Sequence, residues 1–271
     1  PGPRWFQLYA GDRSAAESRI RRAEESNFEA LVVTVDSPVA GKRERMLRHG
    51  IPATSFDVNL RNALRLGPQM IVRPRWLLGR LGATSRGLRA VPLLDDHDRA
   101  TAATPARRGP IGRGGRTAAL SPYTWDDIAW IRERWTGPLL LKGILSGDDA
   151  RAGADAGADA VIVSNHGGRQ LDGAPPTVRV LPEVVAAVGD DCEVLIDGGV
   201  RRGADVVKAL ALGARAVLIG RPYLFALAVA GEAGVERMLE LLHGELCRTM
   251  VLMGCPSIAD LDRSWLRVPE A

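Results

Sequence analysis

Short apolar runs alternate with longer amphipathic segments along most of the chain. Each run is apolar at consecutive positions, which is typical of a strand buried on both faces of a parallel sheet. The alternation therefore indicates βαβ units. The expected strands are Trp5–Tyr9, Leu31–Val35, Leu139–Leu141, Ala160–Val163, Val194–Ile196 and Ala216–Ile219.

The segments between these runs begin at recognisable helix caps. Thr124 precedes Asp127 by three residues, and Ser146 precedes Asp149 likewise, a capping-box spacing with Asp in place of Glu. Further helices are expected at about residues 12–27 and 222–254. The pattern predicts an α/β fold, a TIM (β/α)8 barrel that is incomplete in this chain, with about six of eight strands. A length of 271 residues suits one such barrel domain over residues 1–271.

The pattern lapses between residues 45 and 120, where we expect a mobile insertion. Residues 82–117 are rich in Gly, Pro, Ala, Thr and Arg and lack an apolar period. Residues 42–117 contain sixteen Lys and Arg against five Asp and Glu, whereas the whole chain has a net charge of +4. Because only Phe56 and Trp76 could stack on bases in this basic stretch, we expect no nucleic-acid partner.

Composition excludes several other classes of protein. Hydrophobic residues make up 46% and charged residues 25% of the chain, which argues against wholesale disorder. No apolar run is long enough to span a bilayer. The three cysteines include no CxxC pair, so a disulfide framework or thiolate metal cage is excluded and a cytoplasmic location is expected. No metal site is expected at the isolated histidines His49, His97 and His243.

Polar or glycine-rich clusters follow every apolar run directly. The carboxyl ends of all strands in a β/α barrel open on one face, so these clusters should meet in one site. They are Gln7–Tyr9, Thr34–Asp36, Lys142–Gly143, Ser164–Arg169, Asp197–Gly199 and Gly220–Arg221.

The clusters after the last two runs are candidates for binding phosphate. Glycine frees backbone N–H groups in Asp197–Gly203 and Gly220–Pro222, Arg201 and Arg221 supply positive charge, and Pro222 suits a first helical turn. Tight turns without a ligand are the alternative for each cluster alone. The pair on consecutive strands favours phosphate.

The remaining clusters contain candidate catalytic groups. His166 can act as a general base near neutral pH, and Arg169 can clamp a carboxylate through two hydrogen bonds. Lys142 can be a Schiff-base nucleophile or a cation that stabilises charge on a cofactor. Asp36 and Thr34 can orient a base or bind a polar ring edge, and helix capping is as good an explanation for both.

These clusters resemble the FMN-dependent 2-hydroxy acid oxidases and dehydrogenases, the group of glycolate oxidase and of lactate and mandelate dehydrogenases. The most specific part is the string Ser-Asn-His-Gly-Gly-Arg-Gln-Leu-Asp at 164–172. The resemblance covers essentially the whole chain except residues 82–117. It implies a TIM barrel that holds FMN at its mouth and oxidises an L-2-hydroxy acid to the 2-keto acid.

The resemblance also implies a role for each candidate. His166 would be the active-site base, with Asp36 hydrogen-bonded to it. Arg169, Arg43 and Tyr9 would bind the substrate. Lys142 would lie at the pyrimidine edge of the flavin and stabilise reduced FMN. The other expected contacts to the ring, the ribityl chain and the phosphate are Gln7, Thr34, Ser164, Asp197, Gly198, Gly199, Arg201, Gly220 and Arg221.

The amino end departs from the family pattern. Gln7–Tyr9 resembles the third strand of the family barrel, so we expect the chain to be an N-terminally truncated fragment that lacks two strands or folds poorly alone. Two sheet edges and a gap in the core would then be exposed.

Residues 60–81 combine Leu with Arg and resemble the segment by which some dehydrogenases of this family lie on the membrane. Peripheral contact with the inner face of the membrane would suit quinone as electron acceptor, and oxygen is the other acceptor. An ordinary loop with two short helices explains this segment equally well. A homo-oligomer is also compatible with the sequence.

Two other functions stay open. A Schiff-base or other phosphate-binding barrel enzyme would use Lys142 but leaves His166–Arg169 without a role. A catalytically silent truncated barrel would need none of these residues.

Overall fold

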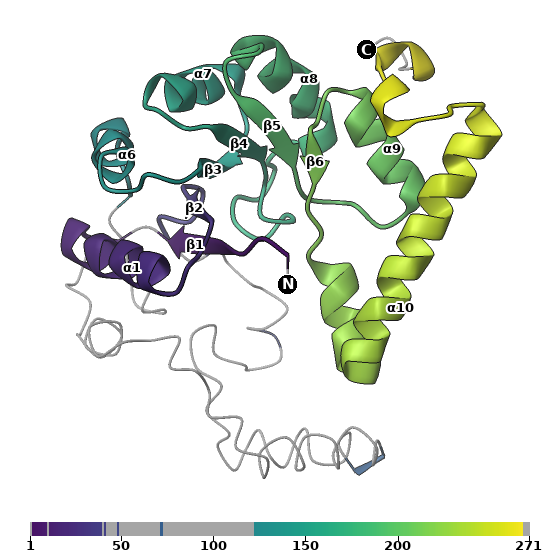
Figure 1. The fold of residues 1–271 in the computed structure, drawn as a ribbon, viewed down its shortest axis with the longest axis horizontal. Helices are drawn as coiled ribbons and strands as arrows, with labels where there is room; N and C mark the ends of the chain where they lie inside the picture. Colours follow the sequence, from purple (N-terminus) through teal and green to yellow (C-terminus); the bar gives the residue numbers. More distant parts are fainter. Residues whose placement is uncertain are drawn as a thin grey trace. The chain divides into compact units, whose positions relative to one another are not determined.

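The computed structural model describes residues 2–9, 11–39, 41, 48, 71–72 and 122–267. The chain divides into two compact units, Pro1–Gly41 with Gly112–Ala271, and Lys42–Ile111. All the helices and strands described below belong to the first unit (Figure 1). The expected insertion at 45–120, its basic part at 60–81 and the candidate Arg43 lie outside the described residues, apart from Arg48, Ile71 and Val72.

Six parallel strands form one sheet in the order β1-β2-β3-β4-β5-β6. The strands are β1 Trp5–Tyr9, β2 Ala30–Thr34, β3 Leu139–Ile144, β4 Ala160–Val163, β5 Glu193–Ile196 and β6 Ala216–Val217. The α/β class and the six strands are as expected. The sheet does not close into a barrel, because within the described residues β1 pairs only with β2 and β6 only with β5.

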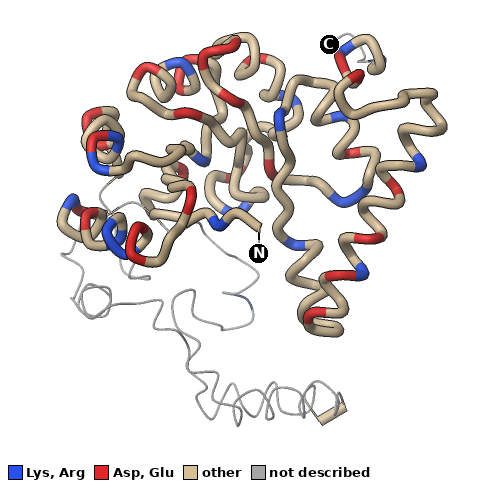
Figure 2. Tube along the Cα trace, in the orientation of Figure 1, with Lys and Arg blue, Asp and Glu red and all other residues tan. Residues whose placement is uncertain are grey.

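Helices connect the strands and cover one face of the sheet (Figure 1). They are α1 Arg13–Glu25, α6 Trp125–Arg132, α7 Gly147–Asp155, α8 Thr177–Val188, α9 Gly203–Ala211 and α10 Arg221–Met253, followed by 3-10 turns at Ile258–Asp260 and Arg263–Trp265. Acidic and basic residues alternate along these helices (Figure 2). Among the residues that the structure describes, no helix is both long and apolar enough to cross a bilayer.

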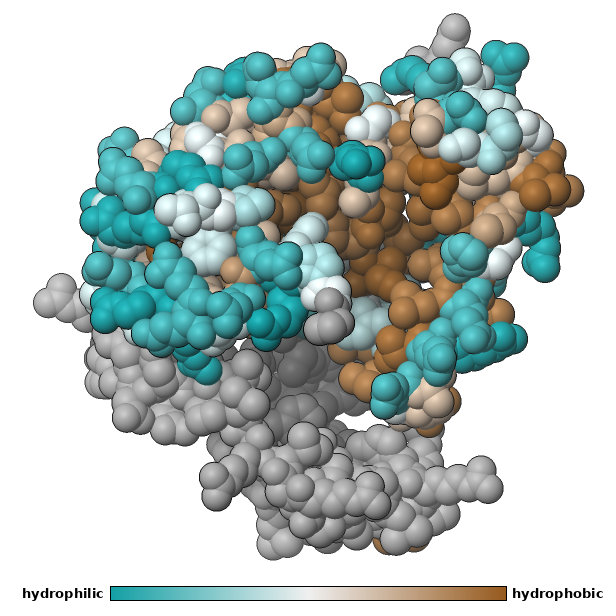
Figure 3. Space-filling model, viewed as in Figure 1, coloured by the Kyte–Doolittle hydropathy of each residue, from teal (hydrophilic) through white to brown (hydrophobic). Residues whose placement is uncertain are grey.

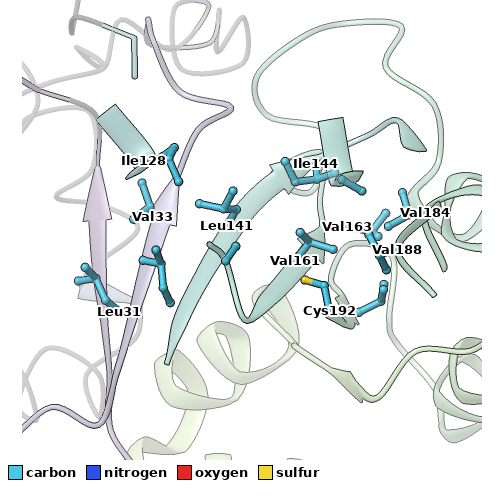
Figure 4. Close-up of a cluster of buried hydrophobic side chains, with 14 of the residues drawn as sticks. Leu31, Val33, Ile128, Leu141, Ile144, Val161, Val163, Val184, Val188 and Cys192 are labelled. Carbon is cyan, nitrogen blue, oxygen red and sulfur yellow. The ribbon is translucent and has the colours of Figure 1, made fainter. Parts of the chain in front are cut away.

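The strands β2 to β5 are buried along nearly their whole length, as their continuous apolar runs predict, whereas β1 buries only Leu8 and β6 is half-buried. Leu31, Val33 and Leu141 pack with helix residues such as Ile128 in a large cluster on the helical side (Figure 4). The alternate positions form a smaller cluster on the opposite face, the side that faces the interior of a closed barrel. Its buried members are Ala30, Val32, Leu140, Ala160, Ile162 and Leu195.

The helix ends follow the expected chemistry. The Thr124 side chain accepts from the backbone N–H of Asp127, whose carboxylate accepts from the Thr124 N–H, a complete capping box. Ser146 caps α7 by accepting from the Asp149 N–H at 3.2 Å. The last strand, expected at Ala216–Ile219, ends at Val217, because its pairing with β5 extends only from Ala216 to Val217.

The helix α10 leaves hydrophobic side chains exposed. Phe225 is 68% and Val229 86% exposed in its first turns, before the non-helical residues Ala230 and Gly231. Figure 3 shows this hydrophobic surface continuing from the sheet onto the helix. The open side of the sheet is therefore apolar.

Candidate functional site

The register of the sheet aligns the strand ends that carry the candidate residues. Tyr9 pairs with Thr34, and Thr34 pairs with Lys142. Val163, the last residue of β4, pairs with Ile196, the last residue of β5. Since the strands are parallel, the polar clusters after them lie along one edge of the sheet.

His166 and Asp36 form the first contact between clusters. The Nδ1 atom of His166 lies 3.2 Å from Oδ1 of Asp36, although the residues are 130 positions apart in sequence. Their side chains are only 20% and 11% exposed. A carboxylate oxygen is an acceptor, so this contact favours, in the neutral imidazole, the tautomer with its proton on Nδ1 and with Nε2 as the acceptor.

The backbone of His166 adopts an uncommon conformation. Its φ of 56° lies in the left-handed region, where residues other than glycine are rare. The His166 N–H donates to Oγ of the fully buried Ser164 at 3.1 Å. Such strain persists only where surrounding contacts hold it, and it occurs often at functional sites.

Lys142 is held by two partners from neighbouring strand ends. Its Nζ donates to Ser164 Oγ at 2.8 Å and lies 3.0 Å from Oδ2 of Asp197. The Lys142 and Asp197 side chains are 12% and 16% exposed, so this ion pair is largely withdrawn from water. Ser164 therefore joins the ammonium of Lys142 to the backbone of His166.

Asp36 sits against the end of β3. Gly143 has a φ of +113°, and a Cβ added there would lie 2.6 Å from the Asp36 Cβ. Only glycine allows this approach. Ser37 Oγ donates to Asp36 Oδ1 at 3.0 Å, and the amide of Gln170 donates to Ser37 Oγ at 2.9 Å.

Neither Ser37 nor Gln170 was among the site candidates from the sequence. Gln170 belongs to the specific string that ends at Asp172, and that string was the one signal that could have pointed to it. Ser37 is a common residue after a strand and carried no signal of its own.

At the β1 end, Gln7 Nε2 donates to Thr34 Oγ1 at 2.7 Å. Tyr9 is 41% exposed, and its carbonyl accepts from the Tyr123 hydroxyl at 3.2 Å. Burial raises the pKa of Tyr123 to about 12, so this phenol remains a neutral donor. Gln7, Thr34 and Tyr9 thus lie at the same edge as Lys142.

The proposed phosphate loops have the conformations that glycine permits. Gly198 and Gly199 have φ of +89° and +80°, and a Cβ on Gly199 would meet nothing within 4 Å. Gly220 caps α10 and Pro222 lies in its first turn. Arg221 donates from Nη2 to the Gly167 carbonyl at 3.1 Å, so it contacts the His166 loop.

Two candidate arginines are exposed. Within the described residues, the guanidinium groups of Arg169 and Arg201 make no hydrogen bond or ion pair, whereas the backbone N–H of Arg201 donates to Asp205 Oδ2 at 3.0 Å. Arg43 lies outside the described residues. The described part of the chain contains no group of three or more His, Cys, Asp or Glu placed to hold a metal ion.

Comparison with known proteins gives one family. The model of the FMN-dependent dehydrogenases matches residues 1–268. The chain is 44% identical to a pre-mycofactocin synthase of Mycobacterium tuberculosis, with 98% of this chain and 65% of that protein covered. It is 42% identical to an L-lactate oxidase of Nostoc, with 99% of this chain and 65% of that protein covered. The chain thus spans less than two thirds of the length of these relatives.

Solved structures of mandelate oxidase are similar to this chain. A complex with (S)-2-phenylpropionate is 39% identical, with a TM-score of 0.69, and the match covers 97% of this chain and 62% of that one. A mandelate oxidase variant with a monooxide FMN adduct has a TM-score of 0.66. Since these relatives are FMN-dependent TIM-barrel oxidases, the open sheet is that of an incomplete TIM barrel.

The geometry at the strand ends is compatible with FMN as the cofactor. Asp36 Oδ2 and Asp197 Oδ1 are buried among the described residues without a hydrogen-bond partner, which is unusual unless a ligand or water donates to them. Lys142 adds a positive charge beside them, and the glycines at 198–199 leave backbone groups accessible. With the family match over 268 residues, these features establish that the chain belongs to the FMN-dependent dehydrogenase family, with FMN as the supported cofactor.

Proposed function

We propose that this chain is the larger part of an enzyme that uses FMN to oxidise an L-2-hydroxy acid to the 2-keto acid. The observation that carries the proposal is the meeting of two polar pairs at one sheet edge, His166 with Asp36 and Lys142 with Asp197. Ser164 connects the two pairs through its hydroxyl oxygen. One pair suits proton transfer, and the other places a cation beside a cofactor site.

His166 is the proposed base. The reaction removes two electrons and two protons from the carbinol of the substrate. His166 Nε2 receives one of these protons, and the two electrons pass with the other proton to bound FMN. Asp36 holds the opposite ring nitrogen, so the free nitrogen faces the substrate and the imidazolium that forms is stabilised.

Arginine side chains are the proposed partners of the substrate carboxylate. Arg169 follows His166 by three residues and is exposed at the same loop. A guanidinium matches a carboxylate with two parallel hydrogen bonds. We assign Arg43 and the Tyr9 phenol to the same substrate on the strength of the family resemblance.

Lys142 and Ser164 are the proposed contacts to the polar edge of the flavin, with Gln7 and Thr34 beside them on β1 and β2. When bound, FMN supplies the two-electron acceptor of the reaction. An ammonium at this edge stabilises negative charge that develops on reduction. The ribityl chain and phosphate are assigned to Asp197, Gly198, Gly199, Arg201, Gly220 and Arg221.

The active form requires a closed barrel in this proposal. The sheet has six strands and an apolar open side, whereas the barrel of this fold has eight. Two further βα units would pair with β1 and β6 and bury that surface. The barrel would then be a single domain with an insertion at about 45–120.

Three relatives named for 2-hydroxy acids support the proposed substrate class. L-lactate oxidase, L-lactate dehydrogenase and peroxisomal (S)-2-hydroxy-acid oxidase are 41–42% identical to this chain. Their common element is a small 2-hydroxy acid, and oxygen or quinone is the proposed acceptor. Peripheral membrane contact through residues 60–81 would favour quinone. Co-sedimentation with anionic liposomes, with and without these residues, tests that contact.

The ion pair of Lys142 makes a Schiff-base enzyme the weaker alternative. An amine must be uncharged to attack a carbonyl, whereas Lys142 is held as an ammonium between a carboxylate and a hydroxyl. Borohydride trapping with a keto acid would reveal such an adduct. We expect no trapped adduct.

One set of spectra tests the proposal. The full-length protein, in which the barrel is closed, is mixed with FMN, made anaerobic and titrated with L-lactate, glycolate and L-mandelate while the flavin absorbance is followed. We expect bleaching by at least one acid, and a His166→Gln variant that binds FMN but bleaches at least a hundredfold more slowly. Bound FMN that none of the acids reduces, or equal bleaching of both proteins, would contradict the proposal.

A further inference from the structure

The side-chain amide of Gln170 contacts four groups within one short segment, residues 36–41. Its Nε2 carries two hydrogens and lies within hydrogen-bond distance of three acceptors, Ser37 Oγ at 2.9 Å and the carbonyls of Asp36 and Val39 at 3.2 Å, so two of the acceptors share one hydrogen. Its Oε1 accepts from the Gly41 N–H at 3.2 Å. The NH₂ group of the amide thus faces acceptors and its oxygen faces a donor, so both halves of the amide form hydrogen bonds.

The backbone on either side is packed tightly. A Cβ on Gly41 would lie 2.0 Å from the carbonyl oxygen of Arg169. The chain passes from the first unit to the second directly after Gly41. Gln170 therefore binds residues 36–41, which directly precede the second unit, to the loop that carries His166.

A continuous set of hydrogen bonds runs from this amide to the proposed base. Gln170 donates to Ser37 Oγ, Ser37 donates to Asp36 Oδ1, and that oxygen contacts His166 Nδ1 at 3.2 Å. Ser37 is 8% exposed, so water competes little for its hydroxyl. The donor from Gln170 directs the Ser37 proton toward Asp36, since the amide occupies a lone pair of the same oxygen.

We propose that Gln170, acting through Ser37, is a positioning residue that fixes the Asp36 carboxylate against Nδ1 of His166. The inference rests on the proposed role of His166 as base. The relay sets which ring nitrogen carries the proton, and thereby keeps Nε2 free to accept one from the substrate. It also explains why an amide stands at this position, because a carboxylate could not donate to two carbonyls and a hydroxyl.

Three single variants and one double variant test the relay in the full-length protein. Gln170→Met keeps the length of the side chain and removes all four contacts. Gln170→Glu keeps an acceptor for the Gly41 N–H and removes the donors. Ser37→Ala removes the middle of the relay, and a double variant combines it with Gln170→Met.

Asp159→Ala is the matched control. Asp159 Oδ2 accepts from the Leu139 N–H at 2.7 Å and pairs with Arg132 at 2.8 Å, at the amino ends of the strands. This control also removes a side chain that hydrogen-bonds to the backbone of another segment, but at the opposite edge of the sheet from the site. It should lower stability and leave every property of the site unchanged.

The first measurement is the tautomer of His166, read from ring-nitrogen NMR shifts of the chain without flavin, with His166→Gln for assignment. We expect Nδ1–H in the unaltered chain and in Asp159→Ala, and a rising share of Nε2–H in all relay variants. An unchanged tautomer in Gln170→Met and Ser37→Ala would overturn the inference, whatever the chain does with FMN.

The second measurement is the rate of 2-keto acid formation. We expect each single variant to lower kcat about fivefold with KM nearly unchanged, the effect of one lost hydrogen bond in the transition state. The double variant should be no slower than the slower single variant, because both changes break one relay. Effects that multiply to about 25-fold would show independent action and refute the relay.

The two proposals fail separately. If the tautomer shifts but no hydroxy acid is oxidised, the relay stands and the proposed function fails. If acids are oxidised and the variants behave like the unaltered chain, the function stands and the relay fails.

Discussion

Replacing Gly143 by alanine tests how closely Asp36 must fit against β3. The new Cβ would lie 2.6 Å from the Asp36 Cβ and 2.8 Å from its backbone nitrogen. Carbon atoms in contact are normally separated by about 3.5–4.0 Å, so Asp36 must move by about 1 Å. The contact from Asp36 to His166 is already 3.2 Å, and a shift of this size would break it.

Two terms set the stability cost of Gly143→Ala. A residue with a side chain at a φ of +113° is strained by about 1–3 kcal/mol. Overpacking adds about 1–3 kcal/mol. We therefore expect the free energy of unfolding to fall by about 2–6 kcal/mol, measured by urea denaturation.

The functional cost comes from the displaced carboxylate. A misplacement of about 1 Å near a reacting group can lower kcat about a hundredfold, and we expect a loss of this order in FMN reduction by a hydroxy acid. Gly254→Ala is the control, because Gly254 has a φ of 77° and no atom within 4 Å of an added Cβ. It should cost about 1–2 kcal/mol and leave the rate unchanged. Equal stability and rate in the two variants would refute the reasoning.

Three further predictions concern other parts of the fold. Burial raises the pKa of the Cys192 thiol to about 11. Iodoacetamide at pH 7.5 should therefore alkylate the exposed Cys247 at least tenfold faster than Cys192, as measured by mass spectrometry. Equal alkylation rates at the two thiols would contradict this prediction. Gly203→Ala would bring a Cβ to 2.1 Å from the backbone nitrogen of Leu246 in α10. The free energy of unfolding should therefore fall by about 3 kcal/mol. An unchanged denaturation midpoint would count against the close packing of α9 on α10. Thr124→Ala should lower stability by about 1 kcal/mol at pH 7. Asp127→Asn tests the carboxylate at this cap, because the backbone N–H of Thr124 and the Arg13 side chain both donate to it and lower its pKa. Its cost should be present above about pH 4 and lost as the pH falls through the folded pKa; a cost that persists at pH 2 would exclude this origin.

The central strands of the sheet could be predicted from local sequence because they are buried on both faces. A run such as Ala160–Val163 is apolar at every position, and its bounds in the structure are those expected. Four strands have other bounds than expected, because strand ends depend on pairing with the neighbouring strand rather than on local propensity alone. They are β2 Ala30–Thr34, β3 Leu139–Ile144, β5 Glu193–Ile196 and β6 Ala216–Val217.

The candidate site could be predicted only in part. The position of His166, Lys142 and Asp36 after strands indicated that they lie at one edge, and the register agrees. The pairing of Lys142 with Asp197 has no sequence signal, since 55 positions separate them and the distance is set by the packing of three strands.

Gln170 and Ser37 show the same limit for positioning residues. Their contact spans 133 positions, and neither residue type is typical of a catalytic group. Such residues are found only when the backbone of both loops is known. Glycines that position neighbouring side chains can be noticed in the sequence more easily, because a close approach such as that at Gly143 leaves no room for any other residue.

The most direct test of the account is the yield of 2-keto acid in a single anaerobic turnover. The full-length protein with bound FMN is mixed with the hydroxy acid that bleaches it, and the keto acid is quantified after quenching. We predict one keto acid for each flavin reduced, with His166→Gln forming none on the same timescale. Flavin reduction without keto acid, or full yield from the His166→Gln variant, would contradict the assignment of these strand ends as the active site.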